Sequence, residues 1–313
     1  MGEKTKISWT ASVAADGSTI QGATFNPWWS CTKVDACCAN CYAETLANRW
    51  GYPWGPTAPR RIFGPKHWAE PLAWNAKAAK TGQPMRVFCG SMCDWAEDRR
   101  DLDDERAKLW KLIEATPALT WLLLTKRAEN IRLMLPTIQI GAREPLLPRF
   151  DNVWVGVTVG MRANLERIAE LRQVPATVRF LSCEPLLEDL GRIDLRGISW
   201  CIVGGESGPS ARQCSVEWIR SIVKQCREAG VKCFVKQLGA NCQTRNDDNF
   251  TGDEGDPSFP KWPDHLIDRI VEQPHGGYQG APVRVRFHDR AGSDPTEWPE
   301  DLRVREMPAR RAP

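Results

Sequence analysis

Residues 26–44 read NPWWSCTKVDACCANCYAE, and this stretch is the most chemically distinctive part of the chain. A short apolar segment precedes it, and a helix-like segment follows it. Within eleven residues it holds four of the twelve cysteines, namely Cys31, Cys37, Cys38 and Cys41. Such a density of thiols usually means metal binding or cross-linking, so the chemistry of these cysteines decides how the rest of the chain is interpreted.

Three explanations compete for these cysteines. A disulfide framework is typical of small secreted domains, whereas this chain has 313 residues and shows no secretory signal. A structural zinc site usually takes two separated pairs, and only one Cys-x2-Cys pair is present, at Cys38 and Cys41. An iron–sulfur cluster needs closely spaced thiolates, and three of them leave one iron of a cube open for a small molecule. The set Cys31, Cys38 and Cys41 has the spacing Cys-x6-Cys-x2-Cys, which by itself leaves zinc and plain buried thiols open.

Composition limits the class of protein. With 42% hydrophobic and 26% charged residues, the chain is expected to be soluble and globular, with one large domain or two smaller ones. No apolar run approaches membrane-spanning length, so no membrane association is expected. The net charge of +3 does not indicate nucleic acid, although residues 303–311 are locally basic. Twelve cysteines without a secretory signal favour a reducing, cytoplasmic compartment.

Seven short apolar segments recur along the chain, and several are followed by a turn and an amphipathic helix. They are nearly continuously apolar, which is typical of strands covered on both faces in a parallel sheet. This alternation predicts an α/β fold, specifically a partial or near-complete TIM-like (β/α) barrel, with a flat doubly wound sheet as the alternative. The predicted strands are residues 22–26, 86–89, 120–124, 153–159, 178–181, 200–203 and 232–235.

Apolar periodicity predicts helices over residues 101–115, 164–174 and 215–230. Asp101 and Ser215 are the expected N-caps of the first and last of these, and Gly230 is expected to end the last.

The sequence also predicts two parts of different character. Residues 1–240 are expected to form the barrel domain with its cysteine loop at residues 31–41. Residues 241–313, rich in Asp, Gly and Pro, are expected to form a loop-rich cap. Within the cap, residues 246–264 read as a long loop and residues 282–288 as an antiparallel strand.

Polar groups follow nearly every predicted strand, at the edge where barrel enzymes place their chemistry. Each is unremarkable alone, as a turn glycine, a loop carboxylate or a solvated cation, but together they indicate one polar-rimmed pocket around the cysteines. These positions are Asn26, residues 90–94 (GSMCD), residues 125–127 (TKR), Thr158, Glu184, residues 204–207 (GGES), Lys236 and Gln237.

Seven sequence blocks occur in this order along the chain: CTKVDACCANCYAE, FCGSMCDW, LLLTKRAENI, VWVGVTV, FLSCEPLL, IVGGESGPSAR and CFVKQLG. Together they resemble the phage Gp37/Gp68 family, a group of uncharacterised radical-SAM-like proteins found in phage and bacterial genomes. The resemblance runs from about residue 6 to residue 239, and the ending DLRVREMP is also similar to the family's C-terminal signature. It implies a partial TIM barrel that carries a [4Fe-4S] cluster and S-adenosylmethionine, but it does not imply a substrate.

The resemblance also implies roles for particular residues. Cys31, Cys38 and Cys41 would bind the cluster, whose reduction by an electron donor would cleave S-adenosylmethionine and release a 5′-deoxyadenosyl radical. The expected contacts to S-adenosylmethionine are Gly90, Ser91 and Met92 for the methionyl amine, Thr158 and Glu184 for the ribose hydroxyls or the amine, and Gly204, Gly205 and Glu206 for adenosine.

The mouth of the expected barrel offers candidate substrate-binding groups. Cations there could hold phosphate or carboxylate, so a nucleic acid or nucleotide is one candidate substrate. The candidates are Asp94, Lys126, Arg127, Lys236 and Gln237. Thiols near strand ends could return a hydrogen atom to a substrate radical, although such cysteines are more often small buried hydrophobes. They are Cys89, Cys93 and Cys183.

Two departures from the family pattern affect these expectations. Residues 11–22, ASVAADGSTIQG, are expected to be an insertion, and Cys37 stands where the family usually has glycine. Cys37 therefore competes with Cys38 as a ligand, and Cys38 is favoured because it keeps the pairing with Cys41. The alternative function is a zinc-containing protein that binds nucleic acid or another protein without catalysis.

Overall fold

The computed structural model describes residues 2–14, 17–136, 150–246, 262–267, 270–271 and 281–309. The chain divides into two compact units, one mainly of residues 1–158 and 166–181, the other of residues 159–165 and 182–308. The expected boundary at residue 240 falls inside the second unit, because later residues pair with earlier strands of that unit. For example, the Val235 amide donates to the Val304 carbonyl at 2.8 Å.

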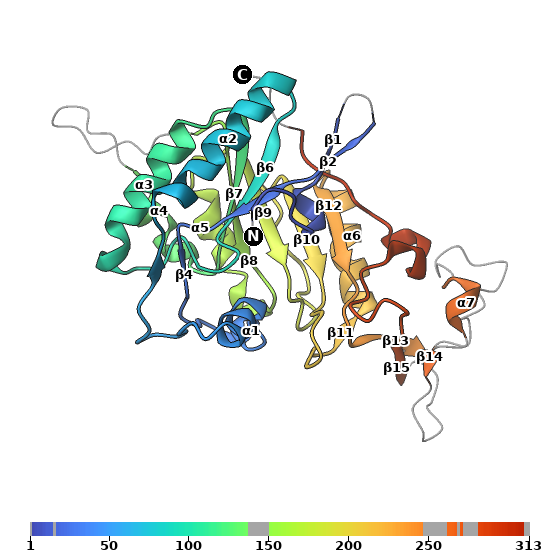
Figure 1. Cartoon of the computed structure of the whole chain (residues 1–313). Coiled ribbons are helices and arrows are strands. Elements are labelled where there is room, and N and C mark those ends of the chain that lie inside the picture. Colours follow the sequence, from blue (N-terminus) through green and yellow to red (C-terminus); the bar gives the residue numbers. More distant parts are fainter. Residues whose placement is uncertain are drawn as a thin grey trace. The chain divides into compact units, whose positions relative to one another are not determined.

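A parallel sheet forms the centre of the first unit (Figure 1). Its strand order is β9-β8-β7-β6-β3, and the pairs β3–β6, β6–β7 and β7–β8 are parallel. Every residue of β3 and β8 is buried, which explains why these strands read as continuous apolar runs. The strands are β3 (Ala23–Phe25), β6 (Met85–Cys89), β7 (Leu119–Thr125), β8 (Val153–Thr158) and β9 (Val178–Cys183), the last of which continues into the second unit.

Five helices accompany the described strands of the first unit. One predicted cap is wrong: Leu102, not Asp101, is the N-cap residue of α3, because a 3-10 turn precedes the helix. The Asp101 carboxylate instead accepts hydrogen bonds from Arg99 at 2.9 and 2.6 Å. The helices are α1 (Tyr42–Arg49), α2 (Pro65–Thr81), α3 (Asp103–Glu114), α4 (Ile131–Met134) and α5 (Arg167–Arg172).

Two short antiparallel pairs complete the first unit. The expected insertion contains β1 (Ser12–Val13) and β2 (Thr19–Ile20), which pair with each other. The second pair is formed by β4 (Trp28–Trp29) and β5 (Arg61–Ile62). This pair holds the start of the cysteine-rich stretch against residues 61–62.

The second unit contains a parallel pair, β10 (Trp200–Gly204) and β12 (Lys232–Gln237), connected through α6 (Val216–Glu228). Ser215 is the N-cap residue of α6 and Gly230, with φ of +66°, follows its end, as predicted.

A four-stranded sheet completes the second unit, with the order β11-β13-β15-β14. The predicted antiparallel strand is present as β15 (Ala281–Val285), whereas most of the expected long loop, residues 247–261, lies outside the described residues. The other elements are β11 (Cys214–Ser215), β13 (Cys242–Asn246), β14 (Ile270–Val271) and α7 (Asp264–Ile267).

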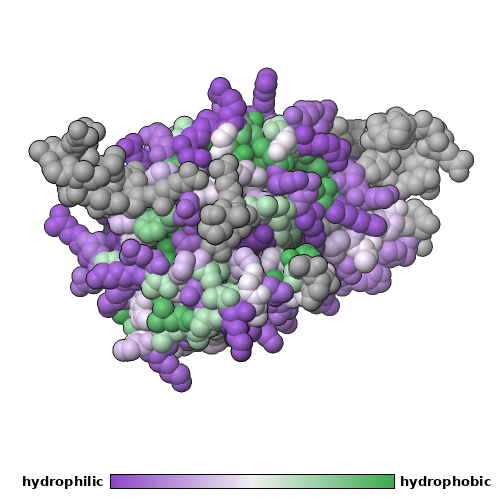
Figure 2. Space-filling view, turned by 90° about the horizontal axis from the view of Figure 1, so that it is seen from above, coloured by the Kyte–Doolittle hydropathy of each residue, from purple (hydrophilic) through white to green (hydrophobic). Residues whose placement is uncertain are grey.

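The expected mixed α/β class is confirmed, with parallel strands accompanied by helices in each unit. Ten of the fifteen tryptophans are buried, so most of them serve packing. Seen from above, the surface is mainly hydrophilic, and apolar side chains form small patches (Figure 2). Within the described part of the chain, no helix combines the length and apolar character needed to cross a bilayer.

Candidate functional site

The cysteine loop, defined as residues 30–41, connects β4 to α1. It starts at Ser30, whose φ of +86° lies in the left-handed region that residues other than glycine seldom adopt. A single 3-10 turn, Ala36–Cys38, begins at Asp35, whose carboxylate accepts from the Cys37 amide at 2.8 Å. Cys41 is the N-cap residue of α1. Backbone in sparsely populated conformations often marks functional loops, and it requires support from surrounding groups.

The buried Asn26 amide joins the carboxyl ends of β3 and β6. Its Nδ2 donates to the Ser91 hydroxyl at 3.0 Å, and its Oδ1 accepts from the Met92 backbone amide at 2.7 Å. The Ser30 amide then donates to the Met92 carbonyl at 3.1 Å, and the Tyr42 hydroxyl donates to the Ser91 carbonyl at 2.7 Å. The segment after β6 is therefore attached to both ends of the cysteine loop.

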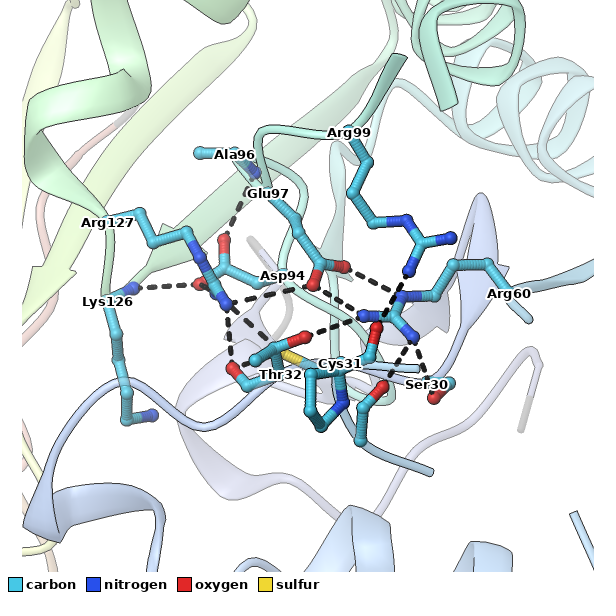
Figure 3. Close-up of polar contacts among 12 residues, drawn as sticks. Ser30, Cys31, Thr32, Arg60, Asp94, Ala96, Glu97, Arg99, Lys126 and Arg127 are labelled. Atoms are coloured by element: carbon cyan, nitrogen blue, oxygen red, sulfur yellow. Dashed lines mark hydrogen bonds and ion pairs between the residues drawn. The ribbon is translucent and has the colours of Figure 1, made fainter. Parts of the chain in front are cut away.

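A buried ion pair between Arg60 and Glu97 lies against the first part of the cysteine loop (Figure 3). Arg60 donates to the Glu97 carboxylate at 2.9 and 2.6 Å. The same guanidinium donates to the Ser30 hydroxyl at 3.3 Å and to the Thr32 hydroxyl at 2.8 Å. The residues on both sides of Cys31 are thus fixed by one charged group, which explains how the Ser30 conformation is supported.

Asp94 and Arg127 form a second buried ion pair, at 2.9 Å, from the ends of β6 and β7 (Figure 3). Asp94 also accepts from the Thr125 hydroxyl at 2.6 Å. Arg127 donates to the Thr32 carbonyl at 2.7 Å and towards the Cys31 sulfur at 3.7 Å. Both groups were predicted to bind substrate; the structure places them beneath the cysteine loop, each less than 10% exposed.

The thiols of the loop differ in their surroundings. Burial, together with the Asp94 carboxylate, raises the pKa of Cys31 to about 12, against the lowering effect of Arg127. Burial and Asp35 raise the pKa of Cys37 to about 11, and its side chain is buried. Cys31, Cys38 and Cys41 are only partly buried. The three cysteines predicted as ligands are therefore more accessible than Cys37.

Lys126 supplies positive charge on the other side of the loop. Burial opposes its charged form, but the neighbouring Cys38 and Cys41 sulfurs and the Asp94 carboxylate leave the pKa of its ammonium group raised. Its side chain points away from the Asp94–Arg127 pair (Figure 3). The lysine is therefore placed to offset negative charge that develops on the sulfurs of the loop.

Arg167 joins the loop to the end of β8. It forms an ion pair with Asp35 at 2.6 Å and donates to the Thr158 carbonyl at 2.9 Å. The Thr158 hydroxyl is completely buried and has no hydrogen-bond partner among the described residues. A buried hydroxyl without a partner is costly, so this position fits a ligand group that would complete its bonding.

The remaining predicted site residues lie in the second unit. The Glu184 carboxylate accepts from the Lys236 ammonium and lies 3.5 Å from the Gln237 amide nitrogen, which donates to the Gly205 carbonyl at 2.5 Å. The two glycines are required by packing, because a Cβ on Gly204 would lie 2.8 Å from the Gln237 carbonyl oxygen and a Cβ on Gly205 would lie 2.8 Å from Cys214 Cβ.

Glu206 has a partner within the same unit. The Arg212 backbone amide donates to its carboxylate at 2.8 Å, and the guanidinium donates to it as well. The three thiols considered for hydrogen-atom transfer, Cys89, Cys93 and Cys183, are all buried. Glu206 is therefore paired with Arg212, and the three thiols are enclosed by packing.

The first unit brings together most of the predicted site: the cysteine loop, residues 90–94, Lys126, Arg127 and Thr158. The second unit separately groups Glu184, Lys236, Gln237 and residues 204–206. Sequence reasoning missed the groups that support the loop, namely Asp35, Arg60, Glu97 and Arg167. Nothing in their local sequence separates them from ordinary surface charges, because their partners lie 37 to 132 residues away.

The thiols do not converge on one point. In the described ranges, no three His, Cys, Asp or Glu side chains are grouped closely enough to hold a single metal ion. A structural zinc site would need four ligands about 2.3 Å or less from one ion. Thiolates that bind an iron–sulfur cube attach to different irons and so stand further apart. The donor set of accessible thiols on one loop with cations beside it fits a cluster better than a single zinc ion.

Comparisons with known proteins yield one finding about the family. A family model described as "Protein of unknown function (DUF5131)" matches residues 4–297. No curated protein and no solved structure gives a significant match. Since the family model covers nearly the whole sequence, the chain belongs to the DUF5131 family.

Proposed function

We propose that this protein is a radical S-adenosylmethionine enzyme in which Cys31, Cys38 and Cys41 bind a [4Fe-4S] cluster. When bound, such a cluster passes an electron from an external donor to S-adenosylmethionine, which yields methionine and a 5′-deoxyadenosyl radical. The proposal includes a cytoplasmic location, because both a reduced cluster and twelve free thiols require a reducing environment.

One observation carries the proposal: the ends of four neighbouring parallel strands are bonded to a loop with three partly buried cysteines. Asn26 continues from β3, Asp94 lies beyond β6, Arg127 follows β7, and Thr158 ends β8. Bonds from these groups, through Arg167 in the last case, reach the cysteine loop or the segment that holds it. A loop that only packed on the surface would not require four strand ends to fix its thiols.

The charged residues have defined tasks in this proposal. Arg127 would donate a hydrogen bond to the Cys31 sulfur, and hydrogen bonds to cluster sulfurs are one means of setting a reduction potential. Lys126 would offset the charge of the Cys38 and Cys41 thiolates. Cys38 is preferred to Cys37 as the second ligand because Cys37 is buried and its amide is fixed by Asp35.

The binding of S-adenosylmethionine follows from the same strand ends. Residues 90–92 would contact the methionyl amine, and the Thr158 hydroxyl would bond to the ribose, completing its missing hydrogen bond. Glu184 and residues 204–206 would contact the rest of the cofactor, and Lys236 and Gln237 the substrate. A partial TIM-like (β/α) barrel fold is part of the proposal.

Anaerobic purification followed by metal analysis tests the proposal. We expect a brown protein with a thiolate-to-iron absorption band and about four irons and four sulfides per chain. Reduction in the presence of S-adenosylmethionine should release 5′-deoxyadenosine, detected by chromatography. Colourless protein that contains one zinc per chain would instead support the binding protein without catalysis.

Single Ser substitutions of Cys31, Cys38 and Cys41 should each remove most of the iron. The matched control is Cys214→Ser, which changes a buried thiol of the second unit and should retain the full cluster. Full iron content and full cleavage activity in any of the three loop variants would remove that residue from the proposed ligand set.

A further inference from the structure

A group of aromatic side chains borders the cysteine loop in the first unit and takes no part in the chemistry proposed above. We call it the aromatic face. Residues 42–66 also carry four arginine or lysine residues but only one acidic residue, Glu44. The aromatic face consists of Trp29, Tyr42, Trp50, Tyr52, Trp54 and Phe63.

Large apolar side chains are unusually exposed here. Of the seven exposed large hydrophobic residues in the described chain, four lie between residues 34 and 62. They are Val34, Tyr42, Trp50 and Ile62, which are 42 to 55% exposed. Single exposed apolar residues are common, but here four of them fall within 29 residues of one stretch of the chain, and grouped exposed apolar residues are typical of binding sites.

The rings are arranged for stacking. Trp50 lies on Trp29 with ring centroids 5.5 Å apart and an angle of 23° between the ring planes. Trp50 is 48% exposed, so the ring can accept a further flat group on the stack. The Tyr42 hydroxyl is fixed by its bond to the Ser91 carbonyl, and its ring remains 55% exposed. Both rings are therefore held in place before any ligand binds.

A hollow adjoins this stack. Its volume is about 100 Å³, and its lining includes Trp29, Tyr52, Trp54 and Arg61. Ser30, the residue directly before Cys31, also lines it. Ser30 therefore belongs both to the cysteine loop and to the lining of the hollow.

Positive charge surrounds the rings. The Arg61 guanidinium carbon lies 4.2 Å from the Tyr52 ring centroid and 4.6 Å from that of Trp29, within the range of cation–π attraction. Arg49 and Lys66 are also exposed at this segment. The single acidic residue, Glu44, is paired with Lys33 at 2.7 Å. Within this stretch of the chain, the exposed cations Arg49, Arg61 and Lys66 are therefore not offset by an unpaired carboxylate.

We propose that the aromatic face binds single-stranded nucleic acid, with a base stacked on Trp50 and phosphates near Arg49, Arg61 and Lys66. Flat rings beside cations are complementary to bases joined by phosphates, which is the usual chemistry of single-strand recognition. An acidic protein would pair with the cations and could pack apolar side chains on the rings, but each nucleotide offers a flat base and a phosphate together. The arrangement therefore favours nucleic acid over a protein partner.

This surface also indicates where a bound strand would lie. Because Ser30 and Tyr42 stand at the two ends of the cysteine loop, the strand would lie next to the proposed catalytic cysteines. The inference that the strand is the substrate rests on the proposed function, whereas the binding itself does not.

Fluorescence anisotropy with labelled, unstructured DNA and RNA oligonucleotides of about 20 nucleotides tests the binding. The wild-type protein should bind these oligonucleotides, and its affinity should fall as the salt concentration is raised. Trp50→Ala should weaken binding about tenfold, Trp50→Phe should retain most of it, and Arg61→Gln should weaken it and reduce the salt dependence. The matched controls are Leu133→Ala, a residue 75% exposed on α4, and Arg196→Gln, an exposed arginine of the second unit.

Several outcomes would overturn the proposal: no binding by the wild-type protein, unchanged binding by both Trp50→Ala and Arg61→Gln, or displacement by polyglutamate as effective as displacement by unlabelled oligonucleotide. Thermal melting would show that the variants fold. Iron content and cleavage of S-adenosylmethionine, measured on the same preparations, separate the two proposals. If the protein binds oligonucleotide but carries no iron–sulfur cluster, this inference stands and the proposed function is rejected. If it carries the cluster but does not bind oligonucleotide, the proposed function stands and this inference is rejected.

Discussion

The Arg60 guanidinium and the Glu97 carboxylate form a two-pronged ion pair in the interior of the first unit, with N–O distances of 2.9 and 2.6 Å. The side chains are only 1 and 4% exposed. The pair is placed so that the remaining donors of Arg60 reach Ser30 and Thr32, the neighbours of Cys31. The buried Arg60 guanidinium thereby fixes the residues on both sides of Cys31, which is one of the proposed cluster ligands.

Arg60→Gln is expected to lower the free energy of unfolding by about 3 kcal/mol, because removal of one partner leaves the buried Glu97 charge without its main counterion. Urea denaturation would measure the change. Arg196→Gln removes a surface pair and should change stability by less than about 0.5 kcal/mol. Equal effects of the two substitutions would show that the Arg60–Glu97 pair has no special role.

Cys37 and Cys38 are expected to differ as ligands although they are adjacent. Cys38→Ser should lose most of the iron, whereas Cys37→Ser should retain it, because the Cys37 side chain is buried and only its neighbour reaches the surface of the loop. Iron analysis and electron paramagnetic resonance of the reduced proteins would measure the difference. The opposite pattern would make Cys37 the ligand.

Asn26→Ala should destabilise the protein by about 1–3 kcal/mol, because the Met92 amide and the Ser91 hydroxyl would lose their buried partner. The variant should also bind less iron than the wild type when the same fraction of each protein is folded. The reason is that the segment after β6, which holds the cysteine loop, would lose its bonds to residue 26. Chemical denaturation and iron analysis would separate these effects. A variant with wild-type iron content would show that the segment after β6 is held by other contacts.

The stability of the protein at low pH should depend on the Asp35 carboxylate. Burial acts to raise the pKa of this carboxyl, but the hydrogen bond and charge of Arg167 outweigh it, and the net pKa lies below the ordinary value of 3.8. The stabilisation is therefore complete above the unfolded pKa of about 3.9 and is lost as the pH falls through the lower folded value. Asp35→Asn should destabilise the protein at neutral pH by less than about 1 kcal/mol, since the pair is only partly buried.

A pH series of thermal melts would measure this effect. The stability difference between wild type and Asp35→Asn should shrink as the pH is lowered below about 4. A difference that stays constant across that range would show that the carboxylate charge is not what stabilises the loop.

Gly204→Ala is expected to cost about 1–3 kcal/mol of stability, because the new Cβ would lie 2.8 Å from the Gln237 carbonyl oxygen. Gly208→Ala is the matched control: no atom lies within 4 Å of its Cβ position, so its stability should change little. Thermal melting of the protein without added ligand would measure both. If Gly204→Ala were as stable as wild type but failed to bind S-adenosylmethionine, the glycine would serve the cofactor and not the packing.

The sequence by itself determined the strands and the strand ends. All seven predicted strands are present, since a short run such as VWVGVTV, rich in β-branched residues and apolar on both faces, favours a strand inside a sheet. Parallel strands finish at the same edge, and this explains why Asn26, residues 90–94, residues 125–127 and Thr158 could be grouped from the sequence. The thiol-rich stretch was evident for the same reason, because its signal lies within eleven residues.

Only the tertiary structure decided which charges support the cysteine loop and which face solvent. Arg60 and Arg61 are neighbours in the sequence, yet Arg60 is buried against Glu97 and Arg61 lies exposed on aromatic rings. Asp94 and Arg127, which read as groups at the mouth of a pocket, are buried beneath the loop instead. The physical reason is that the energy of a charge depends on its counterion and on its access to water, and both are set by residues distant in the sequence.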